Sequence, residues 1–158
     1  TSITVPIEPT MRSYELLEKL SVIGVSAVKD ALIAIDNGVA PVPQTGPASI
    51  AAKITREEAA LDWKVSSKTL HNKIRAFYPQ PQAWTNFRGQ PLKISSAKIS
   101  NSEINLEPGE LRVVGSECLI GTGDACLVLE KLTPAGKKEM SALDWSRGAR
   151  FESSERCG

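Results

Sequence analysis

Apolar residues recur at a spacing of three or four between positions 14 and 35, with one interruption at Gly24. This period is typical of amphipathic helices, so the pattern predicts two consecutive helices. Thr10 is the expected N-cap, and Asn37-Gly38 provides a left-handed stop. Residues 1–9 alternate between apolar and polar and contain two prolines, which predicts a short edge strand before the helices.

The next forty residues predict a linker and two short helices. Residues 39–52 are rich in proline and show no period, as expected for a linker or an extended surface segment. Residues 55–58, Thr-Arg-Glu-Glu, form a capping box that predicts a helix ending near Asp62-Trp63. Ser66 or Ser67 caps a further helix, which prolines end. Its expected apolar face comprises Leu70, Ile74 and Phe77.

After Pro81 the sequence predicts short strands separated by turns. Five strands at this spacing suit a small, closed or nearly closed antiparallel barrel. Ser141 then caps a last short helix over 142–147, which Gly148 ends. The predicted fold class is therefore α+β: a helical segment and linker, a small five-stranded antiparallel β-barrel, and a short C-terminal helix. The expected strands are residues 83–87, 92–100, 110–114, 117–121 and 125–132.

Composition excludes several classes of protein. The chain has 158 residues, of which 41% are hydrophobic, enough for one ordinary core. Its net charge is only +1, which argues against a disordered acidic tail or a uniformly basic nucleic-acid coat. No apolar run has the length of a membrane span, and no secretory signal is visible at the start. The first residue is Thr rather than Met, which predicts a fragment or a processed form.

The near-zero net charge hides a long basic segment. Residues 63–102 contain no Asp or Glu, and such a run indicates a polyanionic partner. Its basic residues are Lys64, Lys68, Lys73, Arg75, Arg88, Lys93 and Lys98. The same segment holds five of the eight aromatic residues, which could stack on unpaired bases or fill a core. For the aromatic rings, packing in the core is the favoured interpretation. For the cations, binding of a polyanion is favoured over simple exposure to solvent.

No residue pattern assembles a catalytic or metal site. The three cysteines form no CxxC motif and His71 is the only histidine, so neither zinc nor a disulfide framework is expected, and a reducing compartment is favoured. Cys118 and Cys126 fall in predicted strands, as expected of small buried apolar groups. Residues 121–123, Gly-Thr-Gly, lie between two strands and predict a hairpin rather than a nucleotide loop. Residues 136–138, Gly-Lys-Lys, fit an exposed turn or a phosphate contact equally well.

Several spaced motifs resemble the methionyl-tRNA formyltransferases. Residues 71–77, His-Asn-Lys-Ile-Arg-Ala-Phe, with Pro79, Pro81, Ala83 and Trp84, are similar to that family's junction segment. Lys53-Ile54-Thr55 with Asp62-Trp63 resembles the approach to this junction. Further similarities follow in the same order and extend the resemblance over nearly the whole chain. They are residues 89–94 with the first barrel hairpin, 122–132 with the closing strand, and 134–142 with the start of the last helix.

The resemblance implies that this chain is one part of a larger enzyme. The family transfers a formyl group from 10-formyltetrahydrofolate to the amino group of Met on initiator tRNA in translation initiation. Its catalytic domain precedes a C-terminal barrel of the oligonucleotide-binding (OB) type. Residues 1–52 then correspond to the end of the catalytic domain. Residues 53–158 correspond to the tRNA-binding domain, with linker helices over 53–82 and the OB-like barrel over 83–145.

The family's catalytic residues have no counterpart in the 158 residues. The Asn, His and Asp set and the His-x-Ser-Leu-Leu-Pro folate loop are missing, and His71 is followed by Asn72-Lys73-Ile74. Gln82 stands where a Gly often precedes the junction Ala. We therefore expect no catalytic residue, no metal and no cofactor on this chain, with 10-formyltetrahydrofolate serving the complete enzyme. The residues expected to contact tRNA phosphates are Lys73, Arg75, Arg88, Lys93 and Lys98, with Lys137 and Lys138 as outlying contacts.

The expected partners are initiator Met-tRNA and the N-terminal catalytic domain, with no membrane and a monomeric state. The compartment would be the cytoplasm in a bacterium and the mitochondrion or plastid in a eukaryote. One alternative is the C-terminal part of a small-molecule formyltransferase or a formyltetrahydrofolate hydrolase, which has no need of the acid-free basic segment. Another is a free-standing OB-type nucleic-acid module, which has no need of the helices before the linker.

Overall fold

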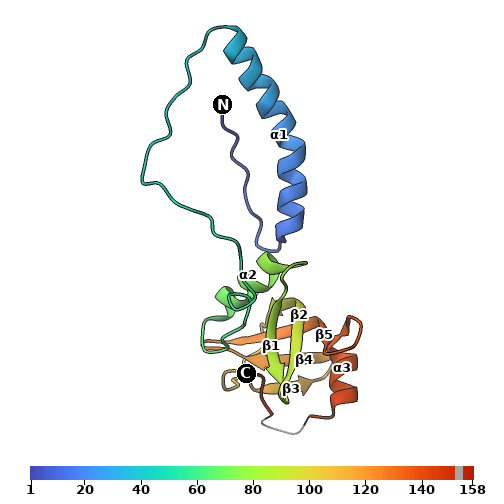
Figure 1. Ribbon diagram of the computed structural model, residues 1–158. Coiled ribbons are helices and arrows are strands. Elements are labelled where there is room, and N and C mark those ends of the chain that lie inside the picture. Colours follow the sequence, from blue (N-terminus) through green and yellow to red (C-terminus); the bar gives the residue numbers. More distant parts are fainter. Residues whose placement is uncertain (152–154) are drawn as a thin grey trace. The chain divides into compact units, whose positions relative to one another are not determined.

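The computed structural model describes residues 1–151 and 155–158. It divides into two compact units, Thr1–Lys53 and Ile54–Gly158 (Figure 1). No helix among the described residues is long and apolar enough to cross a membrane.

The first unit is built on one helix, α1 (Ser13–Asp36), rather than the two predicted (Figure 1). Gly24 lies within α1, because a single glycine costs a helix only about 1 kcal/mol. The N-cap is Arg12 rather than Thr10, with the Arg12 N–H donating to Glu15 Oε2 at 2.7 Å. After the helix, Gly38 takes the predicted left-handed conformation, with φ of 69°.

The segments on either side of α1 have no regular structure. The strand predicted for residues 1–9 is wrong, since the structure gives these described residues no strand partner, and a lone extended segment is not stable as a strand. Residues 39–52 form no helix or strand in the part of the chain that is described, which agrees with the predicted linker or extended surface segment.

The predicted helix after Thr55 is wrong, although its capping box forms. The Thr55 N–H donates to Glu58 Oε2 at 2.7 Å, and the Glu58 N–H donates to Thr55 Oγ1 at 3.2 Å. These bonds enclose a turn rather than the first turn of a helix. The chain then pairs with Trp84: the Trp84 N–H donates to the Ala59 carbonyl and the Leu61 N–H to the Trp84 carbonyl. This long-range pairing ends the turn before a helix can propagate.

Helix α2 (Ser67–Phe77) agrees with the sequence pattern. Ser66 is its N-cap, and its side chain accepts a hydrogen bond from the Thr69 N–H. Leu70 and Ile74 are buried on the predicted apolar face, whereas Phe77 is half-buried.

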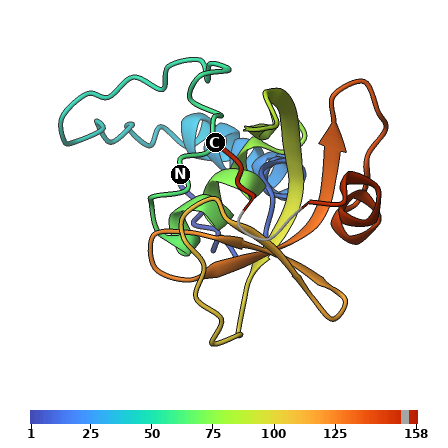
Figure 2. The ribbon, with the colours of Figure 1, turned by 90° about the horizontal axis from the view of Figure 1, so that it is seen from below.

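The described residues form a six-stranded antiparallel sheet in the order β1-β2-β5-β4-β3, with β6 paired to β5 (Figure 1). Helix α3 (Ala142–Ala149) follows β6 directly and lies beside the end of β5 (Figure 2). It continues through Gly148, which was expected to end it, and its C-cap is Arg150 with φ of 46°. The strands are β1 (Ala83–Phe87), β2 (Gln90–Ile99), β3 (Leu111–Val114), β4 (Glu117–Gly121), β5 (Cys126–Pro134) and β6 (Met140–Ser141).

The prediction of a closed or nearly closed five-stranded barrel is corrected in two respects. The sheet has a sixth strand, and within the described residues no strand pairing joins β1 to β3, so it is open. Residues 155–158 bridge to both edges: Cys157 pairs with Phe87 at the end of β1, and Arg156 pairs with Glu110 just before β3. The Gly158 N–H also donates to the Asn86 carbonyl at 3.0 Å. Residues 155–158 therefore contact both edges of the sheet, at the end of β1 and just before β3.

The core lies between α2, α3 and the inner face of the sheet. Residues of β1 alternate between buried and half-buried, and Phe87 packs edge-on against Trp145 at 4.9 Å between ring centroids. Trp63 is buried and its Nε1 donates to Thr85 Oγ1 at 3.0 Å. The three cysteines are also buried free thiols, and burial raises the pKa of both Cys118 and Cys157 to about 12. The interpretation of Cys118 and Cys126 as buried apolar groups is confirmed.

The predicted β4–β5 hairpin holds the start of α2 against the sheet. Asp124 Oδ1 accepts a hydrogen bond from the Ser67 N–H at 2.7 Å, and this bond lowers the pKa of Asp124. The Gly123 N–H donates to the Val65 carbonyl at 3.0 Å. A Cβ at Gly123 would lie 2.1 Å from the Lys64 carbonyl oxygen, so only glycine fits this close approach.

We therefore expect Gly123→Ala to lower the free energy of unfolding by about 1–3 kcal/mol, because the added methyl group forces the hairpin away from α2. Urea denaturation measures this difference. Gly148→Ala is the matched control, since a Cβ there meets no heavy atom of the described chain within 4 Å outside its own helix. It should leave stability unchanged or raise it. Equal denaturation midpoints for Gly123→Ala and the unsubstituted chain would contradict the close approach.

Candidate nucleic-acid interface

The outer face of the β1–β2 hairpin carries a surface pocket. Trp84 and Lys93 are direct cross-strand partners, so their side chains lie on the same face of the sheet. Arg56 reaches this face from the turn that precedes the Ala60–Trp84 pairing. The pocket has a volume of about 370 Å³. We call it the Trp84 pocket; it is lined by Arg56, Pro81, Trp84, Pro91 and Lys93.

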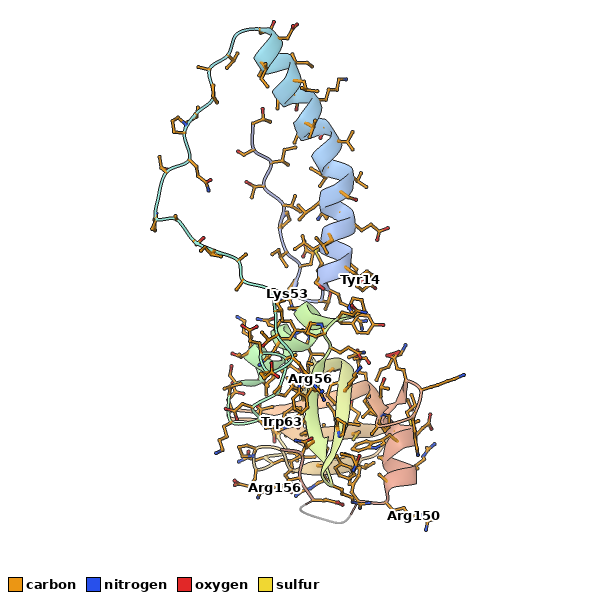
Figure 3. All side chains as sticks on the ribbon, in the orientation of Figure 1. Tyr14, Lys53, Arg56, Trp63, Arg150 and Arg156 are labelled. Carbon is orange, nitrogen blue, oxygen red and sulfur yellow. The ribbon has the colours of Figure 1, made fainter. Side chains whose placement is uncertain are left out.

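Two contacts fix Arg56 against Trp84. The Arg56 guanidinium lies 5.2 Å from the centroid of the indole, within cation–π range. The indole Nε1 donates to the Arg56 carbonyl at 2.8 Å. Figure 3 shows Arg56 beside the β1–β2 hairpin. Sequence reasoning missed this residue because it lies outside the acid-free segment, next to two glutamates, and no local signal indicates that the turn pairs with β1.

The two predicted tRNA contacts on α2 make polar bonds within the protein. Lys73 Nζ donates to the Ala60 carbonyl at 2.6 Å and lies 6.0 Å from the Phe77 ring centroid. Arg75 Nε donates to Asn72 Oδ1 at 3.1 Å. Lys73 therefore also holds Ala60, which pairs with Trp84 of β1, against α2.

His71 adds little positive charge to this helix at neutral pH. Burial lowers its pKa, and the neighbouring Arg75 lowers it further, while Glu130 on β5 acts in the opposite direction. The imidazole is therefore largely neutral at pH 7.

Two of the predicted contacts are paired with carboxylates. Arg88 forms a two-pronged ion pair with Glu155, and its Nη1 donates to the Ala149 carbonyl at 3.1 Å. Lys98 Nζ lies 2.9 Å from Glu117 Oε1, and this hydrogen bond raises the pKa of Lys98. A phosphate would have to compete with these carboxylates.

The remaining three predicted contacts are exposed. Over the ranges that the structure describes, Lys93, Lys137 and Lys138 take part in no ion pair. The strand register pairs Lys93 with Thr133, and the turn that carries Lys137 and Lys138 begins immediately after, at Pro134. Lys93 thus lies with Arg56 at the Trp84 pocket, and Lys137 and Lys138 lie in the turn that follows β5, the strand paired with β2.

The aromatic residues of the basic segment divide between core and surface. Trp63 and Phe87 are buried, which confirms the core alternative for them. Phe77, Tyr78 and Trp84 are half-buried. Of these, Trp84 lines the pocket that also holds two cations.

Residues 53–150 match the family described as formyl transferase, C-terminal domain. Among the similar curated proteins is the methionyl-tRNA formyltransferase of Paenarthrobacter aurescens, 38% identical over 148 residues, which are 93% of this chain and 48% of the relative. The methionyl-tRNA formyltransferase of Roseiflexus castenholzii is 36% identical over 157 residues, 98% of this chain and 50% of the relative. The chain thus spans about half the length of these curated relatives.

Solved structures of HypX from Aquifex aeolicus share the fold. One variant aligns with a TM-score of 0.67 at 18% identity, covering 90% of this chain and 27% of HypX. HypX in complex with tetrahydrofolic acid aligns with a TM-score of 0.62 at 20% identity, covering 90% of this chain and 26% of HypX. Because the family match covers most of the chain and the fold agrees with it, the chain belongs to the formyltransferases and carries their C-terminal domain.

Proposed function

We propose that this chain is the C-terminal, tRNA-binding portion of a methionyl-tRNA formyltransferase. In this proposal the complete enzyme transfers a formyl group from 10-formyltetrahydrofolate to the amino group of Met on initiator tRNA. The observation that carries the proposal is the alignment of 93–99% of the chain with relatives of that name at 34–38% identity. The HypX structures share the fold and therefore do not discriminate between tRNA and a small molecule as the substrate.

The distribution of cations supports a role in holding tRNA. Phosphates dominate the affinity of proteins for nucleic acids, and lysine and arginine are their usual partners. Our proposed primary phosphate contacts are Lys93, Lys137 and Lys138, which are exposed. Lys73 and Arg75 on α2 contribute to the same positive field, while Arg88 and Lys98 contribute less because Glu155 and Glu117 offset their charge. We assign no folate contact to this chain.

The first unit supports the proposal of a catalytic half that precedes this domain. In α1, which the structure describes from end to end, no residue is buried, although many of its residues are apolar. Leu17, Val25 and Leu32 are 66%, 71% and 62% exposed. Exposed apolar surface on this scale indicates a missing packing partner. We propose that residues 1–52 complete the catalytic domain, and that the whole enzyme is a monomer located in the cytoplasm if the source is bacterial.

We expect the 158-residue chain alone to show no formyl transfer, because its sequence lacks the family's catalytic Asn, His and Asp set. The measurement is formylation of charged initiator tRNA with 10-formyltetrahydrofolate as donor. A chimera should be active, in which this chain replaces the matching C-terminal half of the Paenarthrobacter aurescens relative. The matched control is a chimera that carries the corresponding segment of HypX, which should form little product. Turnover by the chain alone, or equal activity of the two chimeras, would contradict the proposal.

A further inference from the structure

We propose that the Trp84 pocket holds one unpaired nucleotide of the bound RNA. The base packs against the Trp84 indole and the Arg56 guanidinium, and the ammonium group of Lys93 contacts an adjoining phosphate. This inference rests on the proposed function and adds to it a recognition site for a base, whereas the exposed lysines recognise only phosphates.

The pocket is built before any ligand arrives. The hydrogen bond from Trp84 Nε1 to the Arg56 carbonyl fixes the ring, and backbone pairing with residues 59–61 fixes the strand that carries it. Pro81 and Pro91 form stiff walls. Because few side chains must be ordered on binding, little of the interaction free energy is lost.

The chemistry of the lining fits a nucleotide. The volume of about 370 Å³ lies in the range of small-ligand sites. Aromatic rings and guanidinium planes are the surfaces on which proteins stack unpaired bases. Of the described residues that line the pocket, none is acidic and two are cationic, so the charge complements a phosphate.

A second pocket of similar volume differs from the Trp84 pocket in the charge of its lining. It has a volume of about 360 Å³ and lies over β2, β4 and β5, where Lys98 is paired with Glu117. Its lining also includes Glu130. Two carboxylates disfavour a phosphate there, so charge rather than volume selects the Trp84 pocket.

The pocket requires a base outside a duplex. A base inside an A-form helix is stacked between its neighbours, and its face is covered. A single-stranded RNA should therefore bind with its base in contact with the indole, whereas a blunt duplex should bind through phosphates alone. The fluorescence of Trp84 should report this difference. The other two tryptophans, Trp63 and Trp145, are only 4% and 7% exposed and are therefore shielded from the RNA.

The test titrates the 158-residue chain with a single-stranded RNA of about twelve nucleotides, a blunt duplex RNA of equal length, and tRNA. We expect single-stranded RNA to change the tryptophan fluorescence and duplex RNA to leave it nearly unchanged. Trp84→Leu should weaken single-stranded RNA binding roughly 5- to 100-fold, as expected for one lost stacking contact. Trp84→Phe should weaken it less and abolish the fluorescence change. Lys93→Gln should weaken both RNAs, and Lys131→Gln, an exposed strand lysine outside the pocket, should weaken neither.

The outcomes separate this inference from the proposed function. If the chain binds tRNA, but Trp84→Leu binds single-stranded RNA as tightly as the unsubstituted chain, the stacking site is overturned and phosphate binding stands. If the unsubstituted chain binds neither tRNA nor single-stranded RNA, the proposed tRNA role fails. Should Trp84→Leu unfold, the fluorescence of the unsubstituted chain decides: no difference between single-stranded and duplex RNA overturns the stacking site.

Discussion

The affinity of this chain for tRNA is expected to fall roughly a hundred-fold between about 50 and 200 mM monovalent salt, if about four phosphates are neutralised. We expect the exposed Lys93, Lys137 and Lys138 to neutralise three of these phosphates, and the α2 cations Lys73 and Arg75 to contribute about one more contact. Each phosphate contact releases condensed counterions and adds about −0.7 to −0.9 to the slope of log affinity against log salt. A titration at several salt concentrations measures this slope.

Single substitutions test which cations contribute. Lys93→Gln should reduce the magnitude of the salt slope by about 0.7–0.9, which is the contribution of one phosphate contact. Lys98→Gln should have a smaller effect, because Glu117 already offsets the Lys98 charge. Phosphates carry no sequence information, so each change should weaken initiator and elongator tRNA about equally. Salt-independent binding, or a strong preference of this chain alone for initiator tRNA, would contradict the proposed role.

Ile74→Ala is expected to lower the free energy of unfolding of the second unit by about 2–5 kcal/mol, since it removes a fully buried branched side chain. Ile74 is 2% exposed and packs in the cluster that joins α2 to the sheet. Urea denaturation measures the difference. Lys68→Ala, at an exposed position of the same helix, is the matched control and should shift stability by less than about 0.5 kcal/mol. An unchanged midpoint for Ile74→Ala would show that this face does not support the fold.

Local patterns predicted most of the second unit. The spans of β1 and β4 agree with the expected strands, and those of β2, β3 and β5 agree within two residues, because alternation and glycine turns mark strands over short distances. Helix α2 was predictable for a similar reason, since its serine cap and terminal prolines are adjacent in sequence. Two errors in this unit arose from long-range pairing: the Ala60–Trp84 pairing replaced a predicted helix, and no local signal indicated that residues 155–158 pair with both sheet edges.

The candidate site was only partly predictable for the same physical reason. The acid-free segment identified Lys93, but not Arg56, which reaches Trp84 only through the fold. Local charge counting also overlooked that Glu117 and Glu155 pair with Lys98 and Arg88, because these carboxylates lie far along the chain. Sequence composition thus indicated a polyanion partner, and three-dimensional pairing decides which cations remain available to it.

The bridging of the two sheet edges by residues 155–158 has a consequence for the order of synthesis. These residues are translated after every strand of the sheet, and the bond from Gly158 to Asn86 closes a long loop. A nascent chain therefore carries the edges of β1 and β3 without these partners until the segment has emerged from the ribosome. During that interval the edges are open templates for pairing with other chains, so shielding by a chaperone matters most at this late stage.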